Sequence, residues 1–412
     1  MNSLYHVRNY VKIKQSDIFV FEYQRKLNYT EKYIYKLDYT KIMSMYPVRR
    51  RTGAAISNYK SMIKNKINIS DNETGAFSNG MYNTIKETAK QFAFEPKIEN
   101  EENFHRTSKY ILVGMGGSHL AADLLKMIKP EIDIIIHRDY GLPTISASDL
   151  KERLIILNSY SGNTEEVLDA YDEARRIGLQ RAVISIGGKL LEMAKKDKIV
   201  YIKMPDFGIQ PRSALPLNLK GLLKLIGEET TLKEVGELQN TFHPEDFEGE
   251  GKMLAEKLRG YIPIIYASAK NEPLAYNWKI KFNETGKIPA FYNVFSELNH
   301  NEMIGFSAGG KSASGGDVYS EVRNLSEKFY FLFLHDSEDH PQIQKRMAIT
   351  AKLYEDRVLP TYKIELSGNA ILHKIFNLLT LADFTAYFTA EGYGLESEQV
   401  PMVEEFKGLI QK

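Results

Sequence analysis

The sequence predicts an α/β protein built on parallel sheets, and three observations lead to this expectation. From Tyr110 onward, short apolar runs rich in β-branched residues alternate with longer helical patterns, which is typical of βαβ units. The alternation occurs in two blocks of similar size, separated by a polar stretch near Glu228–Gly251. Ahead of both blocks lies a basic segment with a different composition.

The first block contains five apolar runs that we expect to be strands. They are Tyr110–Val113, Ile132–Ile136, Leu154–Leu157, Ala182–Ile186 and Ile199–Ile202. Amphipathic helices are expected between them, among them Leu120–Ile128 and Glu165–Ile177. Residues 71–106 form a lead-in helix and linker in this interpretation. The first domain is therefore predicted to span residues 71–240.

The second block follows the same pattern with fewer clear strands. Its apolar runs are Tyr261–Ala267, Ile288–Val294, Phe329–Leu334 and Thr361–Leu366. A long helix is expected from about Ala370 to Thr389. No tandem repeat of short period is present. The second domain is predicted to span residues 241–412.

Residues 1–70 form a basic, tyrosine-rich extension. They hold 14 Lys and Arg against 4 Asp and Glu, together with nine tyrosines and the triplet Arg49-Arg50-Arg51, in a chain whose net charge is +1. Basic residues interleaved with aromatic ones can follow a nucleic-acid backbone. We favour the alternative, a solvated arm or a cap that docks on the rest of the chain, and expect no nucleic-acid partner.

The composition limits the chemistry that the chain can carry. Its 412 residues, 43% of them hydrophobic, suffice for packed cores. The absence of cysteine excludes disulfides, thiolate metal sites and a cysteine nucleophile. No signal-peptide pattern and no apolar run of about 18 residues is present, so we expect a cytoplasmic protein without a membrane partner.

A glycine-rich loop follows the first expected strand. Gly114-Met115-Gly116-Gly117-Ser118 lies between that strand and a helix, where glycines let backbone amides approach an anion at the helix N-terminus. A dinucleotide site would also need glycine at the sixth position, which is His119 here. The pattern therefore argues against a nicotinamide cofactor, and a tight turn without a ligand is the alternative.

A second loop carries three hydroxyl groups at a helix start. Ser159, Ser161 and Thr164 surround Gly162 between the run Leu154–Leu157 and the next helix. Such neutral donors can enclose a phosphate. Capping of the helix by Thr164 is the alternative, but it accounts for one hydroxyl only. The loop is therefore predicted to bind a phosphate.

This loop matches the SIS (sugar isomerase) domain, and the chain resembles the bifunctional phosphoglucose/phosphomannose isomerase family from about residue 75 to residue 410. The further matching segments, in chain order, are Gly208-Ile209-Gln210-Pro211-Arg212-Ser213-Ala214, Asn283-Glu284, Glu297-Leu298-Asn299-His300-Asn301-Glu302 and a C-terminal element from Gly392 to Lys407. The resemblance implies two SIS domains, each a five-stranded parallel sheet flanked by helices, and a homodimer with shared active sites.

The resemblance also implies roles for individual residues. Gly117, Ser118, Ser159, Ser161 and Thr164 would bind the phosphate of a sugar phosphate. Arg212 would face the reacting carbons, Glu284 would be the catalytic base, His300 would open the sugar ring, and Lys407 would assist at the ring.

The chemistry of these residue types agrees with those roles. Moving a carbonyl between C1 and C2 requires one carboxylate to shift a proton through an enediol, as Glu284 could do. Arginine stays protonated and can stabilise the enediolate, which suits Arg212. Histidine exchanges protons near neutral pH, which suits ring opening by His300. The predicted activity is interconversion of glucose 6-phosphate and fructose 6-phosphate, in glycolysis and gluconeogenesis, without cofactor or metal.

Two positions depart from the family pattern. His119 stands where the family usually has a small residue. Val400, beside Gln399, stands where members that accept both C2 epimers have a threonine, seven residues before Lys407. Glucose 6-phosphate is therefore expected to be the better aldose, and activity toward mannose 6-phosphate stays open.

Two other functions remain as alternatives. One is an SIS isomerase for another sugar phosphate, against which the Glu284-to-His300 segment argues. The other is an SIS sensor that binds a sugar phosphate without turnover, which would need no base. Each of Arg212, Glu284 and His300 also has an ordinary structural interpretation, as an ion pair, a helix cap or a loop histidine.

Overall fold

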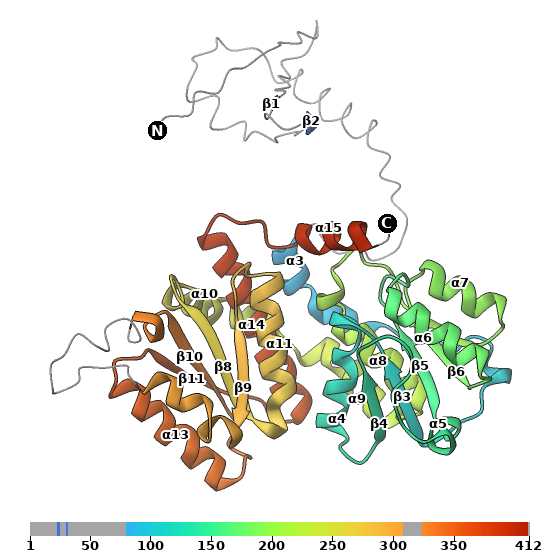
Figure 1. The fold of residues 1–412 in the computed structure, drawn as a ribbon, viewed down its shortest axis with the longest axis horizontal. Coiled ribbons are helices and arrows are strands. Elements are labelled where there is room, and N and C mark those ends of the chain that lie inside the picture. The colour runs from blue at the N-terminus through green and yellow to red at the C-terminus, as the bar shows by residue number, and fades with distance from the viewer. Residues whose placement is uncertain (1–22, 25–29, 32–79, 308–323, 411–412) are drawn as a thin grey trace, which may run out of the picture. The chain divides into compact units, whose positions relative to one another are not determined.

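The computed structural model describes residues 23–24, 30–31, 80–307 and 324–410 (Figure 1). Two short strands, β1 (Tyr23–Gln24) and β2 (Thr30–Glu31), pair antiparallel. The basic extension predicted at residues 1–70 otherwise lies outside the described residues, and its role stays a prediction.

The first lobe contains a five-stranded parallel sheet with strand order β4-β3-β5-β6-β7. Its strands are β3 (Lys109–Val113), β4 (Asp133–His137), β5 (Leu154–Asn158), β6 (Arg181–Ser185) and β7 (Val200–Lys203). All five strands expected in this block are confirmed to within one or two residues. Every residue of β5 is buried, as continuous apolar runs in a parallel sheet require.

Helices cover both faces of this sheet because successive side chains of each strand point to opposite faces. Ile156 of β5 packs into a core with helices α4 (Leu120–Ile128) and α8 (Leu215–Ile226). Ile155 and Leu157 pack into a second core with helices α6 (Glu165–Arg176) and α7 (Gly188–Lys196). The short helix α5 (Ala147–Glu152) precedes β5.

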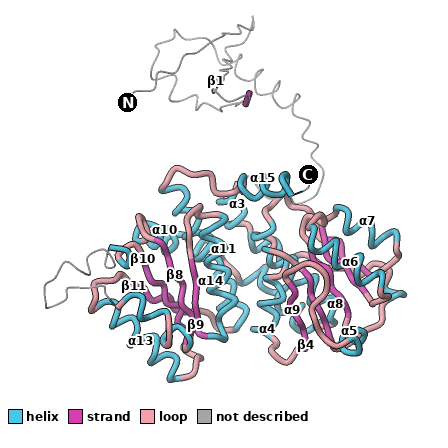
Figure 2. The backbone as a smooth tube through the Cα atoms, in the orientation of Figure 1, coloured by secondary structure: helices cyan, strands magenta, loops and turns pink. Residues whose placement is uncertain are grey.

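The second lobe contains a parallel sheet with strand order β11-β10-β8-β9 (Figure 2). Its strands are β8 (Ile262–Ser268), β9 (Phe291–Phe295), β10 (Phe329–His335) and β11 (Thr361–Glu365). These are the four strands read from the sequence, and the fifth implied by the family resemblance is not found among the described residues. After the edge strand β9 the chain turns into two short 3-10 helices, Glu297–Asn299 and Glu302–Phe306, instead of a further strand.

Helices also cover both faces of the second sheet. Helix α13 (Pro341–Glu355) packs on one face through Met347 and Tyr354. The other face carries α11 (Glu272–Glu284) and α14 (Ile371–Gly392), with α10 (Glu248–Lys257) against α14. This face joins the core of α4 and α8 in the first lobe, so one apolar core runs through both lobes.

The remaining helices lie before, between and after the two sheets. Helix α3 (Met81–Lys86) contacts α14, and α9 (Glu229–Thr241) packs against α8. The polar stretch expected between the domains is therefore largely helical, in α9 and α10, and the domain boundary near residue 240 stays a prediction. The C-terminal helix α15 (Pro401–Ile410) is exposed along its whole length. Among the described helices, none is long and apolar enough to cross a membrane.

Each sheet has one point where consecutive strands are added on opposite sides. In the first sheet β4 lies on one side of β3 and β5 on the other, and in the second sheet β9 and β10 flank β8. The loops that leave the carboxyl ends of the two diverging strands separate there and create a crevice, which is where open α/β sheets bind ligands. We therefore expect a ligand site either at the loops after β3 and β5 or at the loops after β8 and β10.

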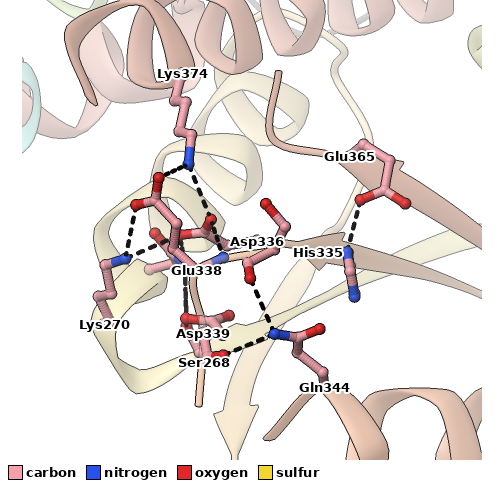
Figure 3. Close-up of polar contacts among 11 residues, drawn as sticks. Ser268, Lys270, His335, Asp336, Glu338, Asp339, Gln344, Glu365 and Lys374 are labelled. Carbon is pink, nitrogen blue, oxygen red and sulfur yellow. Dashed lines mark hydrogen bonds and ion pairs between the residues drawn. The ribbon is translucent and has the colours of Figure 1, made fainter. Parts of the chain in front are cut away.

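At the second switch point, charged side chains form hydrogen bonds and ion pairs with one another (Figure 3). The fully buried carboxylate of Asp336, directly after β10, accepts hydrogen bonds from Lys270 at 3.0 Å, Asn271 at 3.2 Å and Lys374 at 3.3 Å. The backbone N–H of Glu338 donates to it as well, at 3.0 Å. Burial opposes ionisation of Asp336, but these donors outweigh it and lower its pKa to about 2.

The low pKa of Asp336 predicts an acid-sensitive contribution to stability. Since the folded-state pKa lies below the ordinary value of 3.8, the contribution is complete above about pH 5 and is lost as the pH falls toward 2, and it is worth about 2 kcal/mol. Urea unfolding should show that Asp336→Asn is less stable than wild type at neutral pH, and that this difference shrinks between about pH 5 and about pH 2. The exposed Asp172→Asn serves as control. A difference independent of pH would contradict the assignment.

Candidate active site

The loops at the first switch point are tied to each other. The backbone N–H of Tyr160, in the loop after β5, donates to the hydroxyl of Ser118, in the loop after β3, at 3.0 Å. The side-chain amide of Asn158 donates to the carbonyl of Ser118 at 2.7 Å. The structure therefore brings the predicted glycine loop and the predicted hydroxyl loop together at one end of the sheet.

The hydroxyl loop contains a close backbone contact that requires glycine. Gly162 has a φ of 72°, and a Cβ there would lie 1.8 Å from the carbonyl oxygen of Gly187. Only glycine fits this position, for both steric and conformational reasons. The backbone N–H of Gly162 donates to the hydroxyl of Ser159 at 3.0 Å, which fixes that side chain.

The three hydroxyls of this loop differ in their surroundings. Those of Ser159 and Thr164 lie 2.8 Å apart in a mutual hydrogen bond, whereas Ser161 is exposed. Thr164 occupies the N-cap position of α6, but its side chain makes no capping hydrogen bond. The capping explanation for Thr164 therefore fails, and the hydroxyls face the N-terminal end of a 12-residue helix, where an anion is stabilised.

Arg212 lies in a short 3-10 helix, Pro211–Ser213, and its side chain is 1% exposed. Its Nε–H donates to the hydroxyl of Thr285 at 2.9 Å. One terminal nitrogen donates to the carbonyls of Ser397 at 3.0 Å and Glu398 at 2.7 Å. The other terminal nitrogen lies 3.4 Å from a carboxylate oxygen of Glu284.

These contacts fix the orientation of the guanidinium group. Of the five N–H donors of an arginine, three are used by Thr285 and the two carbonyls, and the nitrogen that faces Glu284 carries the other two and donates to the Glu284 carboxylate. Burial lowers the pKa of Arg212, and the nearby carboxylates, Glu284 first among them, act in the opposite direction. The result is a fixed cation that is paired with one carboxylate.

Glu284 is the last residue of α11, and its side chain is 34% exposed. The carboxylate is therefore accessible while Arg212 beneath it is not. The backbone of the glycine loop reaches the same place, because a Cβ on Gly117 would lie 2.6 Å from the backbone of Pro211. The structure thus joins the two loops of the first lobe to Arg212 and to Glu284 of the second.

Two residues predicted for the site are not joined to it within the described part of the chain. His300 follows the 3-10 helix after β9, is exposed, and makes no hydrogen bond to Arg212 or Glu284. Lys407 lies on the exposed helix α15 and pairs with Glu404 at 2.8 Å.

Sequence reasoning missed several residues around Arg212. The ammonium of Lys287 donates to the carbonyls of Glu284 and Gln399. Thr285 and the carbonyls of residues 397–399 complete the surroundings. Residues 397–399 lie in the matching segment from Gly392 to Lys407, but backbone acceptors have no sequence signature, so the contacts of their carbonyls could not have been found. Lys287, only three residues after Glu284, was the one available signal.

The family model and the relatives that match this chain agree with one another. Residues 247–410 match the model of the bacterial phospho-glucose isomerase C-terminal SIS domain. A bifunctional phosphoglucose/phosphomannose isomerase from Caldicellulosiruptor bescii is 33% identical, over 80% of this chain and 97% of that protein. One from Aquifex aeolicus is 31% identical, over 73% of this chain and 90% of that protein.

A solved structure supports the fold alone. The C-terminal domain of glucosamine-fructose-6-phosphate aminotransferase from Francisella tularensis aligns with a TM-score of 0.55 at 13% identity, over 80% of this chain and all of that one.

The contact of Gly117 with Pro211 predicts a strong effect of a single methyl group. Since a Cβ would meet backbone atoms at 2.6–2.8 Å, Gly117→Ala must displace either the glycine loop or Arg212. We expect a loss of roughly 1–3 kcal/mol in the free energy of unfolding by urea. Gly249→Ala in α10, where nothing lies within 4 Å, is the control and should change stability by less than about 1 kcal/mol. Equal stability of the two variants would contradict the predicted clash.

Proposed function

The chain belongs to the bifunctional phosphoglucose/phosphomannose isomerase family, and we propose that the first switch point together with Arg212 and Glu284 is its active site. The protein is an aldose–ketose isomerase that interconverts glucose 6-phosphate and fructose 6-phosphate. The observation that carries the site assignment is the approach of Arg212 and Glu284, at 3.4 Å, beside the loops of the first sheet.

In this proposal the phosphate of the sugar binds between the two loops. The hydroxyls of Ser118, Ser159, Ser161 and Thr164 supply neutral donors, and Gly117 lets the backbone approach. The N-terminus of α6 adds a favourable dipole for the phosphate. The two hydroxyls now bonded to each other, Ser159 and Thr164, would turn their donors toward the phosphate oxygens.

The isomerisation then needs one base and one cation. In the open-chain aldose, the carboxylate of Glu284 removes the proton on C2, and the electron pair forms the C1–C2 double bond of an enediolate. A proton then passes from the C2 hydroxyl to O1, and return of the carbon-bound proton from Glu284 to C1 leaves the carbonyl at C2 and gives the ketose. The terminal nitrogen of Arg212 that donates to Glu284 carries two N–H groups, which lie beside the base and are placed to stabilise the enediolate oxygens.

We further propose a homodimer in which the partner subunit supplies His300 for ring opening. The exposure of His300 and its separation from Arg212 and Glu284 support this arrangement. The exposed helix α15 supports it as well, because it presents several large apolar side chains to solvent: Met402, Val403, Phe406, Leu409 and Ile410. Packing of α15 against a second copy would also fix the position of Lys407. We place the enzyme in the cytoplasm.

The direct test of the function is turnover by the pure protein. Incubation with fructose 6-phosphate should yield glucose 6-phosphate, measured by an assay that separates it from mannose 6-phosphate. Glu284→Gln keeps the shape but loses the basic oxygen, so turnover should fall roughly 10²–10⁴-fold while binding of the sugar phosphate is retained. Glu256→Gln on α10 is the matched control. More than half of wild-type turnover in Glu284→Gln would remove Glu284 from the mechanism.

The shared site predicts complementation between two inactive variants. Glu284→Gln and His300→Ala proteins, mixed so that subunits exchange, should form heterodimers with one doubly altered site and one intact site. Turnover should then approach half of wild type per heterodimer. No recovery, with exchange demonstrated by a mass-tagged subunit, would mean that His300 and Glu284 act within one chain.

A further inference from the structure

The turn between α14 and α15 is held by its main chain. Its carbonyls at Ser397 and Glu398 accept hydrogen bonds from Arg212, and the carbonyl of Gln399 accepts one from Lys287. The carboxylate of Glu396 completes this 396–399 turn by accepting from the backbone N–H groups of Glu398 at 2.6 Å and Gln399 at 2.7 Å. Three consecutive carbonyls are thus directed at two cations.

Lys287 contacts both the turn and the proposed base. It lies three residues after Glu284 and has a φ of 59°, which is uncommon for a residue other than glycine. Its ammonium donates to the carbonyl of Glu284 as well as to that of Gln399. One side chain therefore connects the main chain of the base to the 396–399 turn.

The pKa of Lys287 reflects its burial and the charges around it. Burial lowers the pKa of Lys287 and the neighbouring Arg212 lowers it further, while Glu396 and Glu284 act in the opposite direction. Both cations donate to carbonyl oxygens of the same turn. The turn is therefore part of the electrostatic balance around Arg212.

The chemistry of the reaction gives this arrangement a consequence. The base that converts an aldose to a ketose removes the proton on C2, so groups next to the base surround C2. Glucose 6-phosphate and mannose 6-phosphate differ only in the configuration of that carbon. A turn fastened beside Glu284 therefore borders the one place where the two aldoses differ.

We propose that Lys287 is a positioning residue that fastens the 396–399 turn to Glu284 and so sets the discrimination between the two C2-epimeric aldose 6-phosphates. This inference rests on the proposed function. It assigns Lys287 no contact with the reacting atoms.

The test compares Lys287→Met, which keeps the length but loses the donors, with Lys287→Arg, which keeps charge and donors. The exposed Lys345→Met on α13 is the matched control. For each protein, kcat and KM are measured with glucose 6-phosphate and mannose 6-phosphate, and hydrogen exchange is followed at the amides of residues 398 and 399. Should Lys287→Met fail to fold, Lys287→Gln, whose amide retains neutral donors, replaces it.

We expect Lys287→Met to exchange these amides faster and to change the ratio of kcat/KM for the two aldoses about tenfold, since hydrogen bonds from a charged group are lost. Lys287→Arg should restore most of the wild-type ratio, and Lys345→Met should match wild type. An unchanged ratio in Lys287→Met, or unchanged amide exchange, would overturn the proposal while leaving the function intact. A wild-type protein without aldose–ketose turnover would instead refute the proposed function and this inference with it.

Discussion

The buried guanidinium of Arg212 is the constraint on which the candidate site depends. A charged group that is 1% exposed is tolerated only when its donors are satisfied, because the desolvation penalty amounts to several kcal/mol. Here Thr285 and two backbone carbonyls accept three of its hydrogen bonds, and the carboxylate of Glu284 pairs with its charge. Since these partners come from the end of α11 and from the segment before α15, the burial of one side chain fixes several distant parts of the chain together.

The two sheets show what the same topology can do with different side chains. Both diverge at a switch point, yet only the first offers glycine and hydroxyl loops there. At the second, the carboxylate of Asp336 accepts from Lys270, Asn271 and Lys374, so the charges are paired within the chain. An anion would have to displace a buried carboxylate whose pKa is about 2. Of the two switch points, the first is therefore the one that suits the proposed phosphate site.

Local patterns made most of the fold predictable. The nine strands of the two described parallel sheets lie where the sequence analysis expected them, and α4 spans the expected residues. Central strands such as β5 are clearest in the sequence, because burial on both sheet faces demands a continuous apolar run. The loops after β3 and β5 were also predictable, since glycine and hydroxyl residues have few other reasons to cluster there. The fifth strand of the second sheet, which is not found among the described residues, was expected from resemblance alone and had no apolar run behind it. The contacts of Arg212 were beyond prediction, since carbonyl acceptors exist at every residue and only the tertiary fold selects which ones meet a cation.

Arg212 and Lys287 are held by backbone acceptors of the 396–399 turn, and this bears on substrate specificity. The carbonyls of residues 397–399 would hold Arg212 and Lys287 whatever side chains those residues carried, provided that the turn kept its shape. The turn is shaped by the carboxylate of Glu396, which also bonds only to backbone N–H groups. The side chains of Gln399 and of Val400 after it can thus change without disturbing the contacts that hold Arg212. In the proposed site, substrate preference can therefore vary at these two positions while the geometry of Arg212 and Glu284 is retained.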